Sequence, residues 1–504
     1  MRERPLARRG ALTVAVVAAL TLTACATDTG NGAESPSELT VASPMSVASI
    51  DPHGAGSGDR PTITVAQHIF DTLVVRDGAD FAASLATEWD NSDPLVWRFN
   101  LVEDAEFHDG TAVTAADVVA SYERLIELKG PLASTWAPVE SVVAEDEHTV
   151  VFTTATPMGT FLSNLALLFV APAASLDDPD FFLKPVGSGP FAVESFTQGD
   201  RTVLTRNDDY WGESAKVDRL VIREIPEVSS LVAALETGEV DLTWGIAPDQ
   251  IPTVQGIADV TLESLPSFQY YMNWFNSSRE PFTDPNVRRA LWHAVDVESL
   301  VAQLFPDAAN VASAPIPSTV FGWAAQSPYE YDPELAKKML ADAGYPDGFD
   351  FALDLSVGGG PQIRLIAQTM ISDWQAIGIN VELQEKERAV WLEDLLALNW
   401  DSNLLINSVL TGDADFTLGR LYPSAANRTG YANPELDELL AAAKATVDQD
   451  ERLELYDRAN AIIWDDAVGI FPMELLANYA WSSEVVGFTP DPNETPRFTA
   501  VSMD

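Results

Sequence analysis

Few side chains in this sequence could carry covalent or metal chemistry, and they are widely scattered. Cys25 is the only cysteine, and the five histidines are far apart, at His53, His68, His108, His148 and His293. Neither the GxSxG nucleophile motif nor the HExxH zinc motif occurs. Acidic pairs such as Asp465-Asp466 arise by chance among 76 acidic residues, so they do not identify a glycosidase. The inventory indicates a binding protein rather than an enzyme, and it predicts neither a cofactor nor a metal site.

Cys25 stands directly after a segment typical of an export signal. Four arginines precede an apolar run at residues 11–20. As a helix this segment extends roughly 18 Å, too short for a hydrocarbon layer of about 30 Å, so it predicts a cleaved signal and not a membrane span. Leu22-Thr23-Ala24-Cys25 resembles the bacterial lipobox, whose cysteine is diacylated after cleavage.

We therefore expect residues 1–24 to be removed and Cys25 to anchor the exported chain by two acyl chains. The expected location is the outer face of the cell membrane or the periplasm. With Cys25 lipidated, the mature chain has no thiol for a disulfide or a metal. The alternative is an ordinary secretory signal with a chance cysteine.

The composition indicates a folded and strongly acidic protein. The chain has 504 residues, 46% hydrophobic and 9% aromatic, which favours two or three domains over a disordered acidic polymer. Its 29 Lys and Arg stand against 76 Asp and Glu, a net charge of −47. Such a chain lacks a basic surface for phosphates, so we expect no nucleic acid partner. We interpret the acidity as an aid to solubility or an adaptation to salty or acidic surroundings; the alternative is a field that attracts a cationic ligand.

Local signals predict the elements that would position binding side chains. Thr114 and Asp117 have capping-box spacing, which predicts the start of a helix. Three further helix starts are predicted where an N-cap side chain precedes a proline, at Asp284-Pro285, Asp332-Pro333 and Asn433-Pro434. Strands are predicted at residues 39–42, 149–152, 220–222, 241–244 and 379–383. This alternation of strands and helices predicts an α/β protein.

Several motifs along the chain resemble those of one family. The segment LATEWDNSDPLVWRFNLVEDAEFHDGTAVTAADVVASYERL at 85–125 comes first. It is followed by PVGSGPF at 185–191, RNDDYWG at 206–212, GEVDL at 238–242, FTDPNVRRAL at 282–291 and YANPELD at 431–437. In this order the motifs resemble the bacterial extracellular solute-binding proteins of the dipeptide, oligopeptide and nickel class (solute-binding protein family 5), which serve ABC transporters.

The resemblance implies an α/β fold of the two-lobed periplasmic-binding-protein type II, with an extra subdomain inserted in the first lobe. We place a flexible leash at 25–37, the first lobe at 38–78, 186–282 and 483–504, the inserted subdomain at 79–185, and the second lobe at 283–482. The chain would cross the hinge near residues 270–273 and return near residues 475–478.

The resemblance also implies residues that would hold the charged ends of a peptide, whose burial requires partners of opposite charge. Arg364 matches the arginine that precedes the DW..iGi.v motif of the dipeptide binders. The loop that holds their amine-binding aspartate corresponds to residues 411–416, which are shorter and lack the family's proline and preceding tryptophan. Asp413 is the better match and Asp415 the second. Tyr270 and Tyr271, at the predicted hinge, are further candidate ligand contacts, and Arg364 is alternatively a surface cation.

We therefore predict a monomeric, lipid-anchored receptor that captures a small peptide or similar solute between two lobes and delivers it to an ABC permease. An oligosaccharide receptor of the same fold is the main alternative, because the 13 tryptophans could stack on sugar rings. Trp89, Trp97 and Trp211 fall in family motifs, however, and we expect them in the core. An extracellular hydrolase is the remaining alternative.

Overall fold

The computed structural model describes residues 37–78, 80–357 and 360–504, and residues 37–504 form one compact unit. The predicted signal segment, Cys25 and nearly all of the predicted leash lie outside the described residues. Among the helices of the described ranges, none combines the length and the apolar character needed to cross a membrane.

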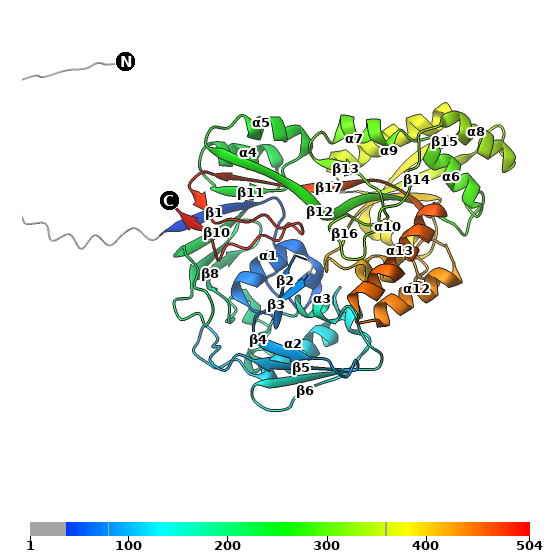
Figure 1. Cartoon of the computed structure of the whole chain (residues 1–504). Coiled ribbons are helices and arrows are strands. Elements are labelled where there is room, and N and C mark those ends of the chain that lie inside the picture. The colour runs from blue at the N-terminus through cyan, green and yellow to red at the C-terminus, as the bar shows by residue number, and fades with distance from the viewer. Residues whose placement is uncertain (1–36, 79, 358–359) are drawn as a thin grey trace, which may run out of the picture. The chain divides into compact units, whose positions relative to one another are not determined.

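An 11-stranded mixed sheet runs through the described chain (Figure 1). Its strands, in spatial order, are β15 (Asn380–Lys386), β14 (Asp350–Ser356), β16 (Ser402–Ser408), β12 (Val260–Phe275), β17 (Gly469–Ser482), β11 (Leu242–Trp244), β1 (Glu38–Ser43), β10 (Arg219–Glu224), β9 (Arg201–Arg206) and β8 (Phe191–Thr197), with β13 (Ala309–Val311) paired to β17. The five predicted strands coincide with β1, β7 (Thr149–Thr154), β10, β11 and β15. The α/β prediction is therefore confirmed.

The segment between β1 and β8 forms smaller sheets. A four-stranded antiparallel sheet has the order β4 (Ala86–Asp90), β5 (Val96–Leu101), β7 and β6 (Val139–Ala144). A hairpin of β2 (Val74–Asp77) and β3 (Asp80–Ala83) precedes it, and β18 (Val485–Val486) pairs with β19 (Ser502–Met503) near the end of the chain.

Several helices of the described chain begin at side-chain capping signals. The helices are α1 (Arg60–Ile69), α2 (Ala115–Leu128), α3 (Phe161–Leu165), α4 (Val228–Glu236), α5 (Ile251–Gln255), α6 (Pro285–His293), α7 (Val297–Leu304), α8 (Pro333–Asp342), α9 (Gly360–Ala376), α10 (Arg388–Leu396), α11 (Leu418–Leu421), α12 (Pro434–Ala445) and α13 (Gln449–Asp465). The Thr114–Asp117 capping box opens α2, and Asp284, Asp332 and Asn433 each accept a backbone N–H at the starts of α6, α8 and α12. All four predicted starts are confirmed.

The buried apolar side chains form three clusters. The largest joins α4 and α5 to most of the chain between β12 and β17. A second surrounds β1, α1, β8 to β11 and the C-terminal segment, and a third fills the space between α2 and the four-stranded sheet. Because the main sheet is continuous across the first two clusters, the predicted lobe boundaries stay a prediction.

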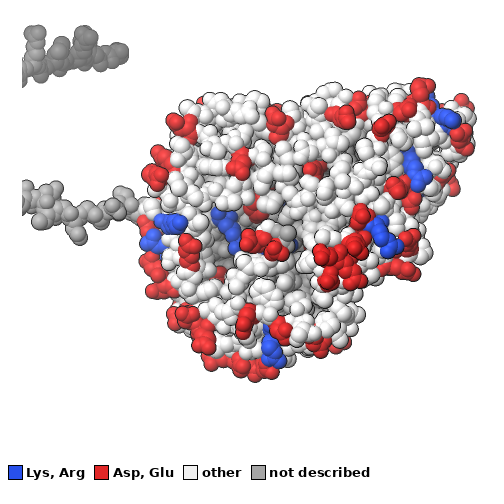
Figure 2. Space-filling model, viewed as in Figure 1, with Lys and Arg blue, Asp and Glu red and all other residues white. Residues whose placement is uncertain are grey.

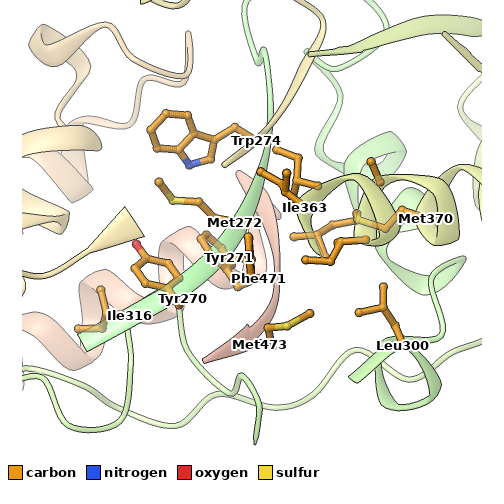
Figure 3. Packing of buried hydrophobic residues seen from close by; sticks show 14 of the residues in the cluster. Tyr270, Tyr271, Met272, Trp274, Leu300, Ile316, Ile363, Met370, Phe471 and Met473 are labelled. Atoms are coloured by element: carbon orange, nitrogen blue, oxygen red, sulfur yellow. The ribbon is translucent and has the colours of Figure 1, made fainter. Parts of the chain in front are cut away.

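The two long strands β12 and β17 pass through the middle of the described chain and pair with each other over most of their length (Figure 1). Their ladder is interrupted between Pro266 and Tyr270. From Ser267 to Phe275 β12 is buried on both faces, as expected for a central strand covered on both sides. Figure 3 shows its side chains beside those of α7, α9 and β17.

Acidic residues are spread over the face seen in Figure 2, and lysine and arginine side chains are few there. This distribution agrees with the net charge of −47. An exposed acidic surface of this kind promotes solubility through mutual repulsion of the molecules.

Candidate functional site

The segment 408–416, which begins at the last residue of β16, borders two cavities. The first has a volume of about 200 Å³, and we call it the arginine cavity. Its lining comprises Arg76, Phe81, Trp89, Asn91, Trp97, Gly159, Leu162, Ser163, Phe321, Asp413, Val447, Gln449 and Arg452. The second has a volume of about 410 Å³, and we call it the α1 cavity. Its lining comprises Met45, Ser46, Gly58, Asp59, Arg60, Pro61, Ser408, Leu410 and Phe416.

Gly412 gives the loop its shape. Its φ is +63°, in the left-handed region that favours glycine. A Cβ at this position would lie 2.9 Å from the ring of Phe268 and 3.0 Å from Cζ of Arg76. The glycine therefore permits both the turn and the close packing that set Asp413 at the edge of the arginine cavity.

Asp413 is buried and already paired. Nη2 of Arg452 lies 2.9 Å from each of its carboxylate oxygens, and the two side chains are 1% and 4% exposed. Asp413 also accepts the backbone N–H of Asp415 at 3.0 Å. Burial disfavours the charge of Arg452, but the Asp413 carboxylate favours it enough that the pKa of Arg452 is raised. The predicted amine-binding carboxylate thus has a permanent cation as its partner.

Arg76 brings a second guanidinium to the arginine cavity. It donates to the carbonyl oxygen of Thr411 and, at 3.5 Å, to that of Gly78. Its Cζ lies 4.9 Å from the centre of the Phe81 ring. Burial lowers the pKa of Arg76 from its ordinary value, while the charges of Asp413 and Asp491 oppose this effect.

The α1 cavity combines an apolar wall with a few polar groups. Arg60, in the first turn of α1, forms an ion pair with Glu494, and Gln269 donates to the same carboxylate. The Ser408 hydroxyl is buried and has no hydrogen-bond partner among the described residues. A buried hydroxyl without a partner is costly, so a polar ligand atom here would be stabilised.

Asp59 and Arg388 place opposite charges near the α1 cavity. Asp59 occupies the N-cap position of α1, but its side chain makes no capping hydrogen bond. Burial raises the pKa of Asp59, and the positive charge of Arg388 at the start of α10 opposes that rise. The Asp59 carboxylate borders the cavity and suits a ligand that carries an amine.

Tyr270 and Tyr271 are buried and Asp415 is half-buried, and none of them lines either cavity. Tyr270 is 1% exposed and its hydroxyl accepts from Nδ2 of Asn407 at 3.3 Å. Tyr271 packs against Phe305, with ring centres 5.9 Å apart, and burial raises its pKa to about 12. Both side chains are within the large cluster (Figure 3), and their role as ligand contacts stays a prediction.

The environment of Asp415 differs from that of Asp413. Its Oδ2 lies 3.6 Å from Nζ of Lys444, and its buried Oδ1 has no hydrogen-bond partner among the described residues. Burial raises the pKa of Asp415, with the Lys444 charge acting in the opposite direction. Its predicted role as second choice for an amine partner is untested.

Arg364 lies on the solvent side of α9. Ile363, Ile366 and Met370 form the buried face of this helix. Arg364 directly follows Ile363, so its side chain points away from that buried face. The Arg364 side chain is 51% exposed and makes two hydrogen bonds of 2.7 Å to Glu385 on β15. The structure does not bring it to the loop that holds Asp413, and its ligand-binding role stays a prediction.

Sequence reasoning missed the arginines of the arginine cavity and the charged residues of the α1 cavity. For one of them, Arg452, the sequence contains a signal. Arg452 has helical spacing with the apolar positions Tyr456, Ala459 and Ile463, all fully buried, so a cation stands on the buried face of α13. A buried arginine requires a partner, but nothing in the sequence identifies that partner as Asp413.

In the described ranges no group of three His, Cys, Asp or Glu side chains is arranged to hold a metal ion. His53 and His68 are fully buried and bound to the backbone oxygens of Phe169 and Thr64. His108, predicted to be structural, has its Nε2 3.0 Å from the backbone oxygen of Gly189 and accepts the N–H of Gly187. Of the tryptophans predicted to lie in the core, Trp97 belongs to the third cluster, whereas Trp89 and Trp211 are half-buried and pack against it. Trp97 and Trp89 also line the arginine cavity.

The chain is similar in sequence to a family of known proteins and to one of its members. The model of the bacterial extracellular solute-binding proteins, family 5 (middle part), matches residues 80–429. The chain is similar to the glutathione-binding protein GsiB of Pectobacterium atrosepticum, with 28% identity over 460 residues that cover 87% of this chain and 89% of that protein.

Two solved structures with bound peptides are also similar. The periplasmic binding protein DppA from Helicobacter pylori, in complex with the peptide STSA, has 27% identity and a TM-score of 0.78 over 92% of this chain and 98% of that one. The dipeptide binding protein from Pseudoalteromonas sp. SM9913, in complex with Met-Leu, has 26% identity and a TM-score of 0.79 over 93% and 100% of the two chains. These likenesses confirm the predicted type II binding-protein fold class.

Proposed function

The chain belongs to family 5 of the bacterial extracellular solute-binding proteins, and from this premise we propose that it captures a peptide-like solute and passes it to the permease of an ABC importer. A member of this family is a receptor and not an enzyme. The relatives support a peptide-like ligand, because one is named for glutathione and two structures contain STSA and Met-Leu.

The α1 cavity carries the proposal. Its volume of about 410 Å³ falls within the range of small-molecule sites, roughly 300–1,000 Å³. It is bordered by apolar side chains, by the Asp59 carboxylate and by the unpartnered Ser408 hydroxyl. Peptides offer apolar side chains, amide groups and two charged ends, so each kind of group in the cavity has a complement on such a ligand.

We propose that ligand binding closes two lobes about β12 and β17. The interruption of their ladder between Pro266 and Tyr270 supports bending at this point, because fewer backbone hydrogen bonds resist it there. Closure requires that the ligand bind one state more tightly than the other. Moving the population from 1:99 to 99:1 takes about 5.5 kcal/mol of differential affinity.

The proposal includes attachment of the receptor to the membrane through diacylated Cys25, at the outer face of the cell membrane or in the periplasm. The Leu22–Cys25 motif supports it. A single receptor molecule would then present the closed form to its permease, and we propose a monomer.

Thermal-shift measurements on the full-length protein, over separate sets of peptides, oligosaccharides and metal chelates, test the proposed ligand class. A ligand at 100 times its Kd stabilises the folded state by about 2.7 kcal/mol, so binders raise the Tm. We expect the peptide set to raise it and Asp59→Asn to reduce that rise, while Asp249→Asn, at another helix start, leaves it unchanged. A rise with oligosaccharides alone would replace the peptide proposal with the carbohydrate alternative.

A further inference from the structure

The arginine cavity contains more positive than negative charge, although the whole chain carries a net charge of −47. Arg76 and Arg452 line it together with one carboxylate, that of Asp413. Arg452 is paired with that carboxylate through Nη2, which also donates to the Tyr456 hydroxyl at 3.2 Å, while Nε donates to the Ala443 carbonyl at 3.1 Å. The charge of Asp413 is therefore compensated without any ligand.

Arg76 lacks a counterion at contact distance. Its hydrogen bonds go to two backbone carbonyls, and no carboxylate of residues 37–78, 80–357 and 360–504 forms an ion pair with it. Asp413 and Asp491 act on it only through their charges. Asp413 is paired with Arg452, and Asp491 accepts from the backbone N–H groups of Asn493 and Thr495 and from the Thr495 hydroxyl. A guanidinium has five N–H donors, so Arg76 retains donors for an anion.

A second donor points to the same chemistry. Trp97 lines the cavity and is 5% exposed, and its buried Nε1–H has no acceptor among the described residues. An unpartnered buried donor is costly. The remaining N–H donors of cationic Arg76 and the unpartnered donor of Trp97 favour a ligand group that accepts hydrogen bonds and carries negative charge.

The walls of the cavity are aromatic and apolar. Phe81 and Trp89 come from β3 and β4, Phe321 from the chain between β13 and α8, and Leu162 and Val447 complete the apolar lining. A dry cavity of about 150 Å³ holds a benzene molecule, so the volume of about 200 Å³ accommodates a ring with a carboxylate attached.

We propose that the arginine cavity binds a carboxylate-bearing apolar group, with Arg76 and Trp97 donating to the carboxylate and the aromatic walls enclosing the apolar part. This inference rests on the proposed receptor function and refines its ligand class. The proposed anion site differs from the prediction that Asp413 holds a free amine, and the pairing of Asp413 with Arg452 favours the anion site. The group is either a free organic acid or the acidic end of a longer peptide-like ligand that continues into the α1 cavity past the shared loop 408–416.

Calorimetry on the full-length protein with benzoate, benzamide and benzylamine tests the charge preference. The three probes have the same ring and carry negative, zero and positive charge. We expect benzoate to bind about ten- to a hundredfold more tightly than benzamide, the range for a hydrogen-bonded charge, and benzylamine to bind least. Equal affinities, or benzylamine as the tightest probe, would overturn the proposal and return Asp413 to the role of an amine partner.

Variants assign the preference to Arg76. Arg76→Gln should remove the advantage of benzoate over benzamide, and Arg76→Lys should retain most of it. Arg98→Gln, an exposed arginine beside Trp97 whose partner is Glu145, is the matched control and should leave all three affinities unchanged. Should Arg76→Gln fail to fold by circular dichroism, the wild-type charge series and Arg76→Lys still decide the question. Unchanged benzoate binding by folded Arg76→Gln contradicts the proposal.

A pair of peptides distinguishes the source of the carboxylate. N-succinyl-Leu-Leu should bind more tightly than Leu-Leu if the cavity takes the acidic end of a longer ligand, whereas benzoate binding without this gain identifies a free organic acid. Binding of Leu-Leu with neither benzoate binding nor a gain from succinylation would refute the anion site and leave the receptor function intact. Benzoate binding without any peptide binding would refute the peptide-like ligand class alone.

Discussion

Arg452 and Asp413 form an ion pair that is withdrawn from solvent and joins α13 to the loop after β16. The guanidinium nitrogen lies 2.9 Å from both carboxylate oxygens, and the two side chains are 1% and 4% exposed. Arg452 also lies over the rings of Phe321 and Tyr456, with its Cζ 4.8 Å and 5.4 Å from their centres. The pair thereby holds the wall of the arginine cavity in place.

Removal of Arg452 should strongly destabilise the fold. Arg452→Met leaves the Asp413 carboxylate buried without its partner, and breaking a buried pair in this way costs about 3–5 kcal/mol. Urea unfolding measures the loss. Arg458→Met on the same helix, whose pair with Glu435 is 59% and 64% exposed, is the control and should cost about 0–1 kcal/mol. Equal losses in the two variants would contradict the structural role of the buried pair.

Gly412 should be far less tolerant of alanine than a glycine of similar conformation elsewhere. Gly412→Ala places a Cβ 2.9 Å from the Phe268 ring, whereas a Cβ at Gly110, φ +80°, has nothing within 4 Å. Both variants place alanine in a left-handed conformation, which costs about 1–2 kcal/mol. The difference between their unfolding free energies therefore measures the cost of the steric contact with Phe268. We expect Gly412→Ala to lose at least about 1 kcal/mol more. Matching values would show that the loop accommodates a side chain.

Asp71 should make the fold less stable as the pH rises through mildly acidic values. Burial raises its pKa from 3.8 to about 6, against hydrogen bonds from Tyr210 and Trp211 that favour its charge. Between these two values the folded state retains a proton that the unfolded state has released, so this contribution to stability is lost as the pH rises through the window. Its size is about 3 kcal/mol.

Asp71→Asn should remove that contribution. The histidines His53 and His68, with pKa values lowered to about 4 by burial, have the opposite effect on stability but are present in both proteins. Denaturant unfolding of the wild type and of Asp71→Asn gives the difference between their unfolding free energies. Measurements from about pH 4 to about pH 7 span the window. Parallel pH profiles would show that Asp71 titrates normally.

Arg364→Ala should change the stability of the fold by about 0–1 kcal/mol, because its pair with Glu385 is exposed. The same variant tests the sequence-based role of Arg364 in ligand binding. A buried contact with a ligand carboxylate requires a loss of about 2–5 kcal/mol in peptide affinity by calorimetry. Unchanged affinity would contradict that role.

Cys25→Ala should abolish partition of the protein into a detergent-rich phase. The expectation follows from the Leu22–Cys25 motif and from the stable anchoring that two acyl chains provide. Phase separation followed by mass measurement of the amino terminus checks it. Wild-type protein found free in the culture medium with an unmodified amino terminus would refute lipid anchoring.

The sequence alone determined the features that depend on neighbours a few residues apart. The capping box of Thr114 and Asp117 joins positions three apart and starts a helix in any fold that keeps the segment helical. Asp284 before Pro285 is likewise a local signal that starts a helix, through an N-cap side chain followed by proline. The alternating and β-branched residues of β7 and β10 likewise predicted strands, and the ordered motifs predicted the family.

Only the tertiary structure decided which side chains meet at the site. Arg452 reaches Asp413 across 39 positions of sequence, and Arg76 reaches the Thr411 carbonyl across 335. These contacts depend on the order of strands in the sheet, on the interruption of the β12–β17 ladder and on the close packing that Gly412 permits. Residue type shows that a buried arginine needs an acceptor. In a chain with 76 acidic residues, only the folded geometry selects Asp413 for Arg452 and leaves Arg76 without an ion pair at contact distance among the described residues.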